Sequence, residues 1–269
     1  MPSAPVSSRV GTAVKRAGEC ALNLVFPLQC WSCGEPLPRL PRDLPSTARS
    51  RFFCSQCDAD FPKIEPPYCD RCGEPYDLET DGPFRCWNCT GRRIGFEFAV
   101  SGYHAAGPVR DMIHRFKYGR ELAMRGALTT LLADALTDPR IESESWSEWC
   151  LVPVPLHRSR EFEREFNQAW ELCEQLSRRI GATPVKALIR TQPTQSQASL
   201  DRRRRLRNLR GVFDLQPSRP WRKAPDLKGR KILLVDDVLT TGATTHECAR
   251  VLRRQAGVEK VVVITVARG

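Results

Sequence analysis

The sequence predicts an α/β protein in which a doubly wound parallel sheet follows a small, metal-stabilised module. Two observations support this class. Eight cysteines form four C-x-x-C pairs, all of them within the first 90 residues. From about Gly102 onward, short apolar runs alternate with amphipathic segments of helical length. Because helices that alternate with buried strands cover both faces of a parallel sheet, this order predicts a doubly wound arrangement.

The composition leaves room for both parts. The chain has 269 residues, of which 41% are hydrophobic, enough for one large domain or for a medium domain and a small one. Its formal net charge of +11 favours an anionic partner, which is a nucleic acid, a phosphorylated metabolite or a membrane surface. No apolar run approaches ~18 residues, so no transmembrane helix is expected.

Residues 1–29 form an extension ahead of the cysteine pairs. Basic residues precede the apolar stretch 21–27, as they do in a short signal peptide. Glu19 and Asn23 interrupt the pattern, however, and no small-x-small cleavage site follows. We therefore expect a short helix that packs ahead of the first cysteine pair.

Residues 30–95 form a module that is too small and polar to fold without a staple. A C-x-x-C turn directs two thiolates at one metal, and two such turns complete a tetrahedral site, so eight cysteines fit two structural zinc ions. Redox chemistry or an iron–sulfur cluster is the alternative. The expected ligands, in consecutive groups, are Cys30, Cys33, Cys54 and Cys57, then Cys69, Cys72, Cys86 and Cys89.

A crossed pairing would instead join the first turn to the third. The sequence Cys-Gly-Glu-Pro occurs after both of these turns, at Cys33 and at Cys72, which suggests two copies of one ribbon and favours the consecutive grouping. The four remaining cysteines, Cys20, Cys150, Cys173 and Cys248, lie in apolar or helical contexts and are expected to be buried thiols. This usage indicates a reducing compartment and a cytoplasmic location.

Residues 96–269 carry the expected sheet. Its first helix presents Met112, Ile113 and Phe116 on one face, with the stem of Lys117 beside them. Gly181 is expected to cap the C-terminus of the helix at 167–180. In chain order we expect a strand or turn from 103, helices at 109–118 and 121–136, a strand at 150–155, a helix at 167–180, a weak strand at 185–189, a strand at 212–215, a strand at 231–235 followed by a loop and a helix at 245–254, and a strand at 258–266.

The segment 232–245 carries the main candidate site. An apolar run from Ile232 to Val235 leads directly into Asp236 and Asp237, which we place at the carboxyl end of a buried strand, where open α/β sheets bind ligands. Their oxygens suit a sugar diol or magnesium, whereas a loop that opens a helix can hold a phosphate. An ordinary strand ending in an acidic turn is the alternative. The expected phosphate-binding residues are Thr240, Thr241, Gly242, Ala243, Thr244 and Thr245.

This segment resembles the phosphoribosyl pyrophosphate (PRPP) signature of type I phosphoribosyltransferases. The resemblance implies that fold, with Asp236 and Asp237 as catalytic residues at the ribose hydroxyls, magnesium as cofactor with PRPP, and the threonine loop at the 5′-phosphate. The second binding turn, for pyrophosphate, is expected in Val152–Arg160 from its two prolines and its cations. The residues expected to bind there are Pro155, Leu156, His157, Arg158 and Arg160.

Most of the chain resembles the ComF family, the competence-associated phosphoribosyltransferase-like proteins with a double zinc ribbon. The resemblance rests on the cysteine pairs, Phe116-Lys-Tyr118, Val152-Pro-Val-Pro155, Phe166-Asn-Gln168, the stretch from Thr194 and Gln197 to Asn208 that ends in Gly211-Val-Phe213, and the segment 235–244. One departure is Glu165, where the family commonly has glycine. The resemblance implies DNA uptake in natural transformation, with single-stranded DNA at the inner side of the membrane and a competence helicase as partners.

The stretch 190–210 is rich in arginine, and by position it corresponds to the flexible loop that covers PRPP in type I enzymes. A solvated basic helix and a contact with nucleic-acid phosphates are the alternatives. Two functions therefore stay open: a phosphoribosyl-transferring enzyme, and a single-stranded DNA-binding protein that uses the transferase fold as a scaffold without turnover. The arginines expected to serve either are Arg202, Arg203, Arg204 and Arg205.

Overall fold

A computed structural model describes residues 28–38, 40–41, 43–76, 84–141, 145–193, 209, 211–218, 220 and 223–269. The chain divides into two compact units, Met1–Asp60 and Phe61–Gly269, and each is treated by itself below. Among the described residues, no helix has the length and apolar character needed to cross a membrane. The helix expected within residues 1–29 lies outside the described residues, except for its last two positions.

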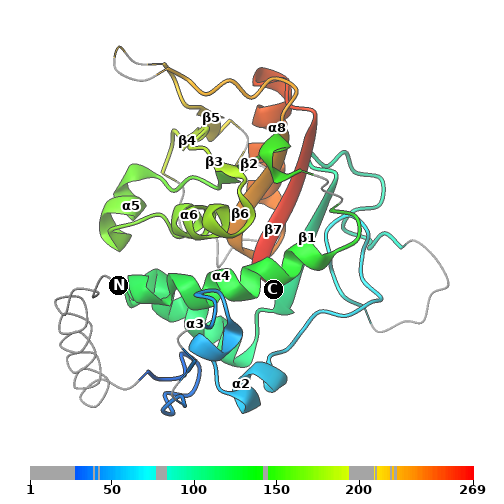
Figure 1. The fold of residues 1–269 in the computed structure, drawn as a ribbon. Helices are drawn as coiled ribbons and strands as arrows, with labels where there is room; N and C mark the ends of the chain where they lie inside the picture. The colour runs from blue at the N-terminus through cyan, green and yellow to red at the C-terminus, as the bar shows by residue number, and fades with distance from the viewer. Residues whose placement is uncertain are drawn as a thin grey trace, which may run out of the picture. The chain divides into compact units, whose positions relative to one another are not determined.

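The predicted parallel sheet is confirmed. In the part of the chain that the structure describes, it has five strands in the order β1-β7-β6-β2-β3, all paired in parallel (Figure 1). The neighbouring strands β6 and β7 consist mostly of apolar residues, as expected for strands that are covered on both faces. The strands are β1 Phe98–His104, β2 Trp149–Pro153, β3 Thr183–Pro184, β6 Lys231–Leu239 and β7 Lys260–Arg268.

Helices cover both faces of this sheet. α4 and α6 pack against each other and against the sheet, whereas α8 joins Ile232, Leu234, Val261 and Val263 in a separate core cluster (Figure 1). The helix expected at 121–136 is interrupted, because short 3-10 turns at Leu122–Met124 and Asp134–Thr137 flank α4. Within the described residues of this unit the helices are α3 Gly107–Tyr118, α4 Arg125–Ala133, α5 Arg158–Arg164, α6 Gln168–Ile180 and α8 Ala243–Gln255, with a 3-10 turn at Trp146–Glu148.

One expectation about the strands was incomplete, and a second was wrong. The segments near 188 and 213 form strands β4 (Leu188–Arg190) and β5 (Phe213–Leu215), but these pair antiparallel in a separate two-stranded sheet. Strand β6 also does not end before the two acids. Its pairing with β7 continues through Asp236↔Thr265 and Val238↔Ala267, so that both aspartates lie within the strand.

The two cysteine modules are copies of one ribbon. Cys30 and Cys69 each donate a backbone N–H to a glutamate carbonyl, Glu35 in the first copy and Glu74 in the second, at 2.8 Å in both. The glycine after the second cysteine has a positive φ in both copies, 80° at Gly34 and 65° at Gly73. The repetition read from Cys-Gly-Glu-Pro therefore extends to the backbone. The first copy also contains a 3-10 turn at Arg49–Arg51 and helix α2 at Ser55–Asp60.

The second ribbon is attached to the edge strand β1. Ala99 donates its N–H to the carbonyl of Arg71 at 3.0 Å, and a Cβ on Gly73 would stand only 3.0 Å from the Ala99 carbonyl. Arg140 donates to the Asp70 carbonyl at 2.8 Å and lies over the Phe98 ring at 4.5 Å. The ribbon therefore folds as part of the same unit as the sheet.

Candidate functional site

The four sulfurs of each cysteine group lie within 4.8 Å of one another, in the consecutive grouping that the sequence favours. Four thiolates complete a tetrahedral zinc site and leave no position for a substrate, so both groups fit structural zinc. The groups differ in exposure: Cys33 of the first is exposed, whereas all four cysteines of the second are buried. The expected burial of Cys150, Cys173 and Cys248 is confirmed, and Cys20 lies outside the described residues.

A cleft of about 530 Å³ opens beside the carboxyl-terminal half of β6. Its lining includes acids and arginines, together with two threonines that follow the acids in the sequence. The lining residues used below are Lys117, Tyr118, Pro155, Leu156, Arg160, Arg164, Asn167, Arg190, Asp236, Asp237, Thr240 and Thr244.

The two aspartates have different partners. Buried Asp237 forms an ion pair with Lys117, whose Nζ lies 2.8 Å from Oδ2 of the aspartate. Asp236 is half-buried and accepts the backbone N–H of Asp237 at 2.9 Å. Burial and the neighbouring Asp237 charge raise the pKa of Asp236 to about 8. Burial opposes the charge of Lys117, but the two aspartates outweigh it and raise the pKa of Lys117. At neutral pH the cleft therefore holds an ion pair and a carboxyl group that a cation would deprotonate.

Sequence reasoning did not identify Lys117 as a site residue. The signal was present, since the lysine follows Phe116 on the same side of α3 as Met112 and Ile113, all of which are buried. A charged side chain beside an apolar helix face needs a partner when the face is covered. The partner, Asp237, lies 120 positions further along the chain, so only the fold brings the two together.

The raised pKa of Asp236 predicts a pH-dependent stability. Because the folded chain holds this proton up to about pH 8 and an unfolded aspartate releases it near 3.8, the free energy of unfolding falls as pH rises between these values. The Asp236→Asn variant lacks this titration. Denaturant unfolding of both proteins from pH 6 to 9 should show the wild type losing stability relative to the variant up to about pH 8. A difference that does not change with pH would contradict the assignment.

The threonine loop contributes two residues to this cleft. Thr240 and Thr244 line it, and Gly242 turns the chain with a φ of 70° into the start of α8. Thr241 and Gly242 instead line a smaller cavity of about 200 Å³ beside the second ribbon. Ala243 and Thr245 are buried, and the hydroxyl of Thr245 donates to the Gly242 carbonyl at 3.1 Å. Thr245 thus fixes the shape of the loop rather than facing the cleft.

The prolines at 153 and 155 lead into the cleft. Pro155, Leu156 and Arg160 line it, but helix α5 begins at Arg158, so the expected turn is shorter than Val152–Arg160. His157 does not line this cleft. Its Nδ1 accepts the N–H of Ser159 at 3.3 Å and so caps α5.

Glu165 occupies the position at which the family commonly has glycine. Its φ is 69°, in the left-handed region that glycine adopts freely, so the backbone turn is kept at a cost of roughly 1–2 kcal/mol. The carboxylate forms an ion pair with Arg120, at 2.5 Å. Next to this turn, Arg164 lies over the Tyr118 ring at 4.9 Å and donates to Gln168 at 3.2 Å.

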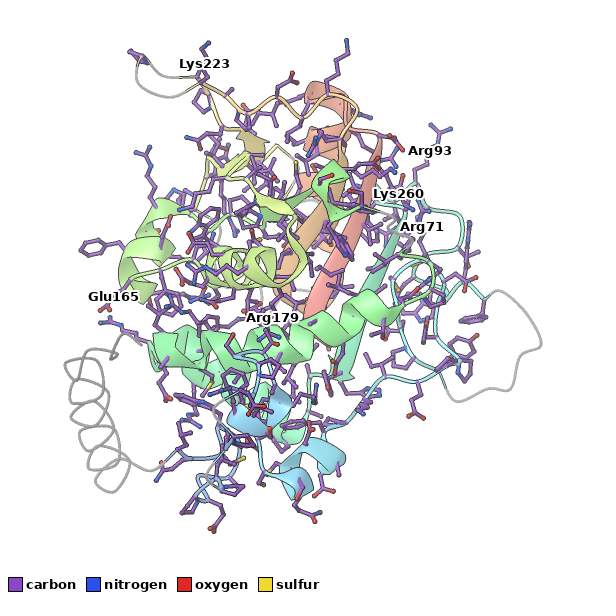
Figure 2. All side chains as sticks on the ribbon, in the orientation of Figure 1. Arg71, Arg93, Glu165, Arg179, Lys223 and Lys260 are labelled. Carbon is purple, nitrogen blue, oxygen red and sulfur yellow. The ribbon has the colours of Figure 1, made fainter. Side chains whose placement is uncertain are left out.

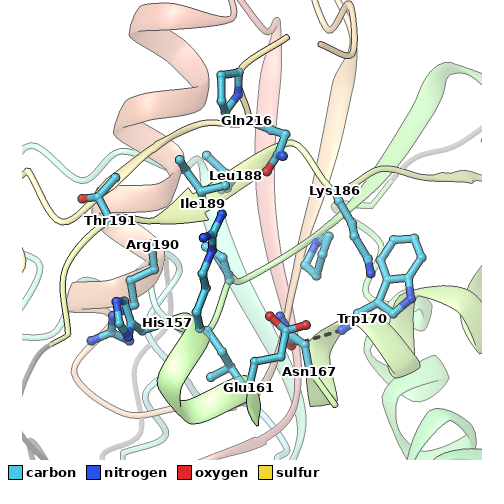
Figure 3. Close-up of a pocket in the computed structure, with 15 residues that line it drawn as sticks. His157, Glu161, Asn167, Trp170, Lys186, Leu188, Ile189, Arg190, Thr191 and Gln216 are labelled. Atoms are coloured by element: carbon cyan, nitrogen blue, oxygen red, sulfur yellow. Dashed lines mark hydrogen bonds between the residues drawn. The ribbon is translucent and has the colours of Figure 1, made fainter. Parts of the chain in front are cut away.

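A second cavity of about 680 Å³ is lined in part by residues of the 153–158 segment (Figure 3). It contains His157 and Arg158, and it shares Pro155, Leu156, Asn167 and Arg190 with the first cleft. Lys186 lies over the Trp170 ring at 4.2 Å. Asn167 supports the shared wall, because its side chain donates to the Val154 carbonyl at 3.2 Å and accepts the N–H of Ala169 at 3.0 Å. Of the predicted arginines 202–205, none lies within the described residues.

Two segments match known domain families. Residues 21–91 match the double zinc ribbon domain, and residues 174–269 match the phosphoribosyl transferase domain. The first span includes both cysteine groups, and the second includes both aspartates and the threonine loop.

Similarity to curated proteins extends over most of the chain. The chain is 31% identical over 217 residues to competence protein F of Haemophilus influenzae, a match that covers 80% of this chain and 90% of that protein. It is 31% identical over 233 residues to DNA utilization protein YhgH of Escherichia coli, covering 86% and 93% respectively. Competence protein ComFC of Streptococcus pneumoniae is 25% identical over 220 residues, covering 80% and 87%.

Proposed function

Because the chain belongs to the competence protein F family, we propose that it acts in the uptake or use of DNA and that its cleft binds magnesium PRPP. The observation that carries the ligand is the charge composition of the cleft, whose lining includes Asp236 and Asp237 together with Arg160, Arg164 and Arg190. A phosphorylated ribose bearing pyrophosphate needs oxygen acceptors for its diol and cations for its phosphates.

In this proposal each part of the cleft has one task. The aspartates accept the ribose hydroxyls, Thr240 and Thr244 donate to the 5′-phosphate, and the arginines hold the pyrophosphate. Magnesium, when bound with PRPP, supplies charge neutralisation of the leaving oxygens. When the bond between the anomeric carbon and pyrophosphate breaks, its electron pair leaves with pyrophosphate and the ribose becomes cation-like. The two carboxylates then stabilise that positive charge electrostatically, while a nitrogen acceptor forms the new bond.

The test is calorimetric titration of the zinc-loaded protein with PRPP, with and without magnesium. We expect magnesium-dependent binding that Asp236→Asn weakens on the order of 10- to 100-fold, the usual value of a hydrogen bond to a charged group. Glu259→Gln, which removes an exposed acid outside the cleft, is the charge-matched control and should bind as the wild type does. If Asp236→Asn bound magnesium PRPP as tightly as the wild type does, the cleft would not be the PRPP site.

Single-stranded DNA is the second proposed ligand, favoured by the net charge of +11 and by the names of the relatives. Under this alternative the transferase fold is a scaffold without turnover, and a competence helicase would receive the DNA. Replacing Arg202, Arg203, Arg204 and Arg205 with alanine should then weaken DNA binding and its dependence on salt. An affinity for single-stranded DNA that changes neither with salt concentration nor on replacement of these arginines would exclude the alternative.

A further inference from the structure

Trp87 is exposed at the tip of the last cysteine turn. The whole residue is 82% exposed. By the same measure Trp149 is 1% exposed, and the other tryptophans among the described residues are half-buried. Burying a large aromatic ring is among the most favourable contributions to folding, so a ring left in water contributes nothing to this fold. Such a ring is available to a ligand.

The turn that carries Trp87 is held firmly. Cys86 and Cys89 are buried on either side of it, and the Cys86 carbonyl accepts the N–H groups of Cys89 at 2.8 Å and of Thr90 at 3.0 Å. The turn belongs to the second ribbon, which is attached to β1 through Arg71 and Gly73. A ligand that stacks on Trp87 would therefore order little protein backbone, which lowers the entropic cost of binding.

Arginines flank this ring in the sequence, and one of them contacts the turn that carries it. The segment 84–95 contains exposed Arg85, Arg92 and Arg93 and no acidic residue. Arg92 donates to the Asn88 carbonyl at 3.2 Å, which places its guanidinium beside the turn. Figure 2 shows Arg93 and Arg71 at one edge of this unit, and burial followed by the nearby charge of Arg85 lowers the pKa of Arg71.

We propose that Trp87, with Arg85, Arg92 and Arg93, forms a binding site for single-stranded nucleic acid. The indole ring stacks on an unpaired base, and the arginines pair with the flanking phosphates. Duplex DNA does not fit, since its base faces are covered by their neighbours. A membrane or an apolar protein partner would need a continuous apolar patch, whereas within 84–95 Trp87 is the exposed apolar side chain and Phe84 and Ile94 are half-buried.

This site is separate from the cleft and goes beyond the proposed PRPP binding. It also differs from the arginines 202–205, because it combines cations with an aromatic ring and can therefore distinguish a base from an empty sugar.

The experiment measures the affinity of the full zinc-loaded chain for two labelled oligonucleotides of equal length by fluorescence anisotropy. One is oligo-thymidine, and the other is an abasic strand with the same phosphates. We expect Trp87→Ala to weaken thymidine binding by about 5- to 100-fold, the range for loss of one stacked base. Binding of the abasic strand should not change, and Trp87→Phe should restore most of the affinity. Arg92→Gln with Arg93→Gln should weaken both strands equally.

Phe162→Ala is the matched control, because Phe162 is 90% exposed on α5 but its two sequence neighbours, Glu161 and Glu163, are acidic. It should leave both affinities unchanged, and zinc content should stay the same in all variants. The proposal would be overturned if Trp87→Ala left thymidine binding unchanged. It would also be overturned if Trp87→Ala weakened binding of the thymidine and abasic strands equally. Binding of the chain through Trp87 to anionic vesicles, and not to oligonucleotides, would contradict it as well. Asp236→Asn should bind nucleic acid as the wild type does. A failure of the PRPP proposal would therefore be distinguishable from a failure of the Trp87 proposal.

Discussion

Replacing Cys86 with serine is expected to release one zinc ion and to unfold much of the Phe61–Gly269 unit. Cys86 is 5% exposed and belongs to a cysteine group that is buried throughout. Structural zinc sites supply about 10–16 kcal/mol of apparent binding free energy, which equals or exceeds the net stability of most domains, about 5–15 kcal/mol. Because the second ribbon is attached to β1, its loss should expose the edge of the sheet.

Zinc content by mass spectrometry and thermal unfolding by circular dichroism provide the measurements. The matched variant is Cys33→Ser, which alters the exposed cysteine of the first ribbon, in the other compact unit. It should also release one zinc ion but leave the main unfolding transition of the larger unit nearly unchanged. If Cys86→Ser kept two zinc ions and an unchanged transition, the second group would not hold structural zinc.

Lys117→Met is expected to destabilise the protein by about 3–5 kcal/mol, the usual cost of leaving one charge of a buried pair without its partner. Asp237, whose side chain is 7% exposed, would remain in the site without the ammonium that lies 2.8 Å away. The double variant Lys117→Met, Asp237→Asn removes both charges and should recover much of this loss. Denaturant unfolding at pH 7 measures all three proteins.

Lys231→Met serves as the control for the lysine-to-methionine change. Lys231 pairs with Glu148 at 2.9 Å, but the glutamate side chain is 61% exposed, so water screens the pair and its loss should change the stability little. A Lys117→Met protein no less stable than Lys231→Met would mean that the Asp237 pair is not shielded from water.

The sequence predicted most of what local pattern controls. The cysteine spacing identified both metal groups, and their repetition selected the consecutive grouping. Branched apolar runs located β2, β6 and β7, and Gly181 caps α6 with a left-handed φ of 79° as expected. In each case the feature depends on residues that are close together in the chain.

Features that depend on distant partners were missed. The strand β1 was not recognised before Tyr103, because Ser101 and Gly102 interrupt its apolar pattern. In the structure the Ser101 hydroxyl bonds Thr265 at 2.6 Å, and Gly102 gives room to α4, where an added Cβ would lie 3.3 Å from the Leu131 carbonyl. The antiparallel pairing of β4 with β5 and the ion pair of Lys117 likewise depend on contacts that no local window contains.

The order of the strands has a consequence for how the chain is made. Strand β1 pairs with β7, and the partners Ser101 and Thr265 lie 164 residues apart. At synthesis rates of about 5–20 residues per second, the ribosome needs roughly 10 to 30 s to supply the partner of β1. During that interval the cysteines of both ribbons have already emerged and can take up zinc. The second ribbon, bonded to Ala99, can therefore shield one region of the waiting strand until the sheet closes.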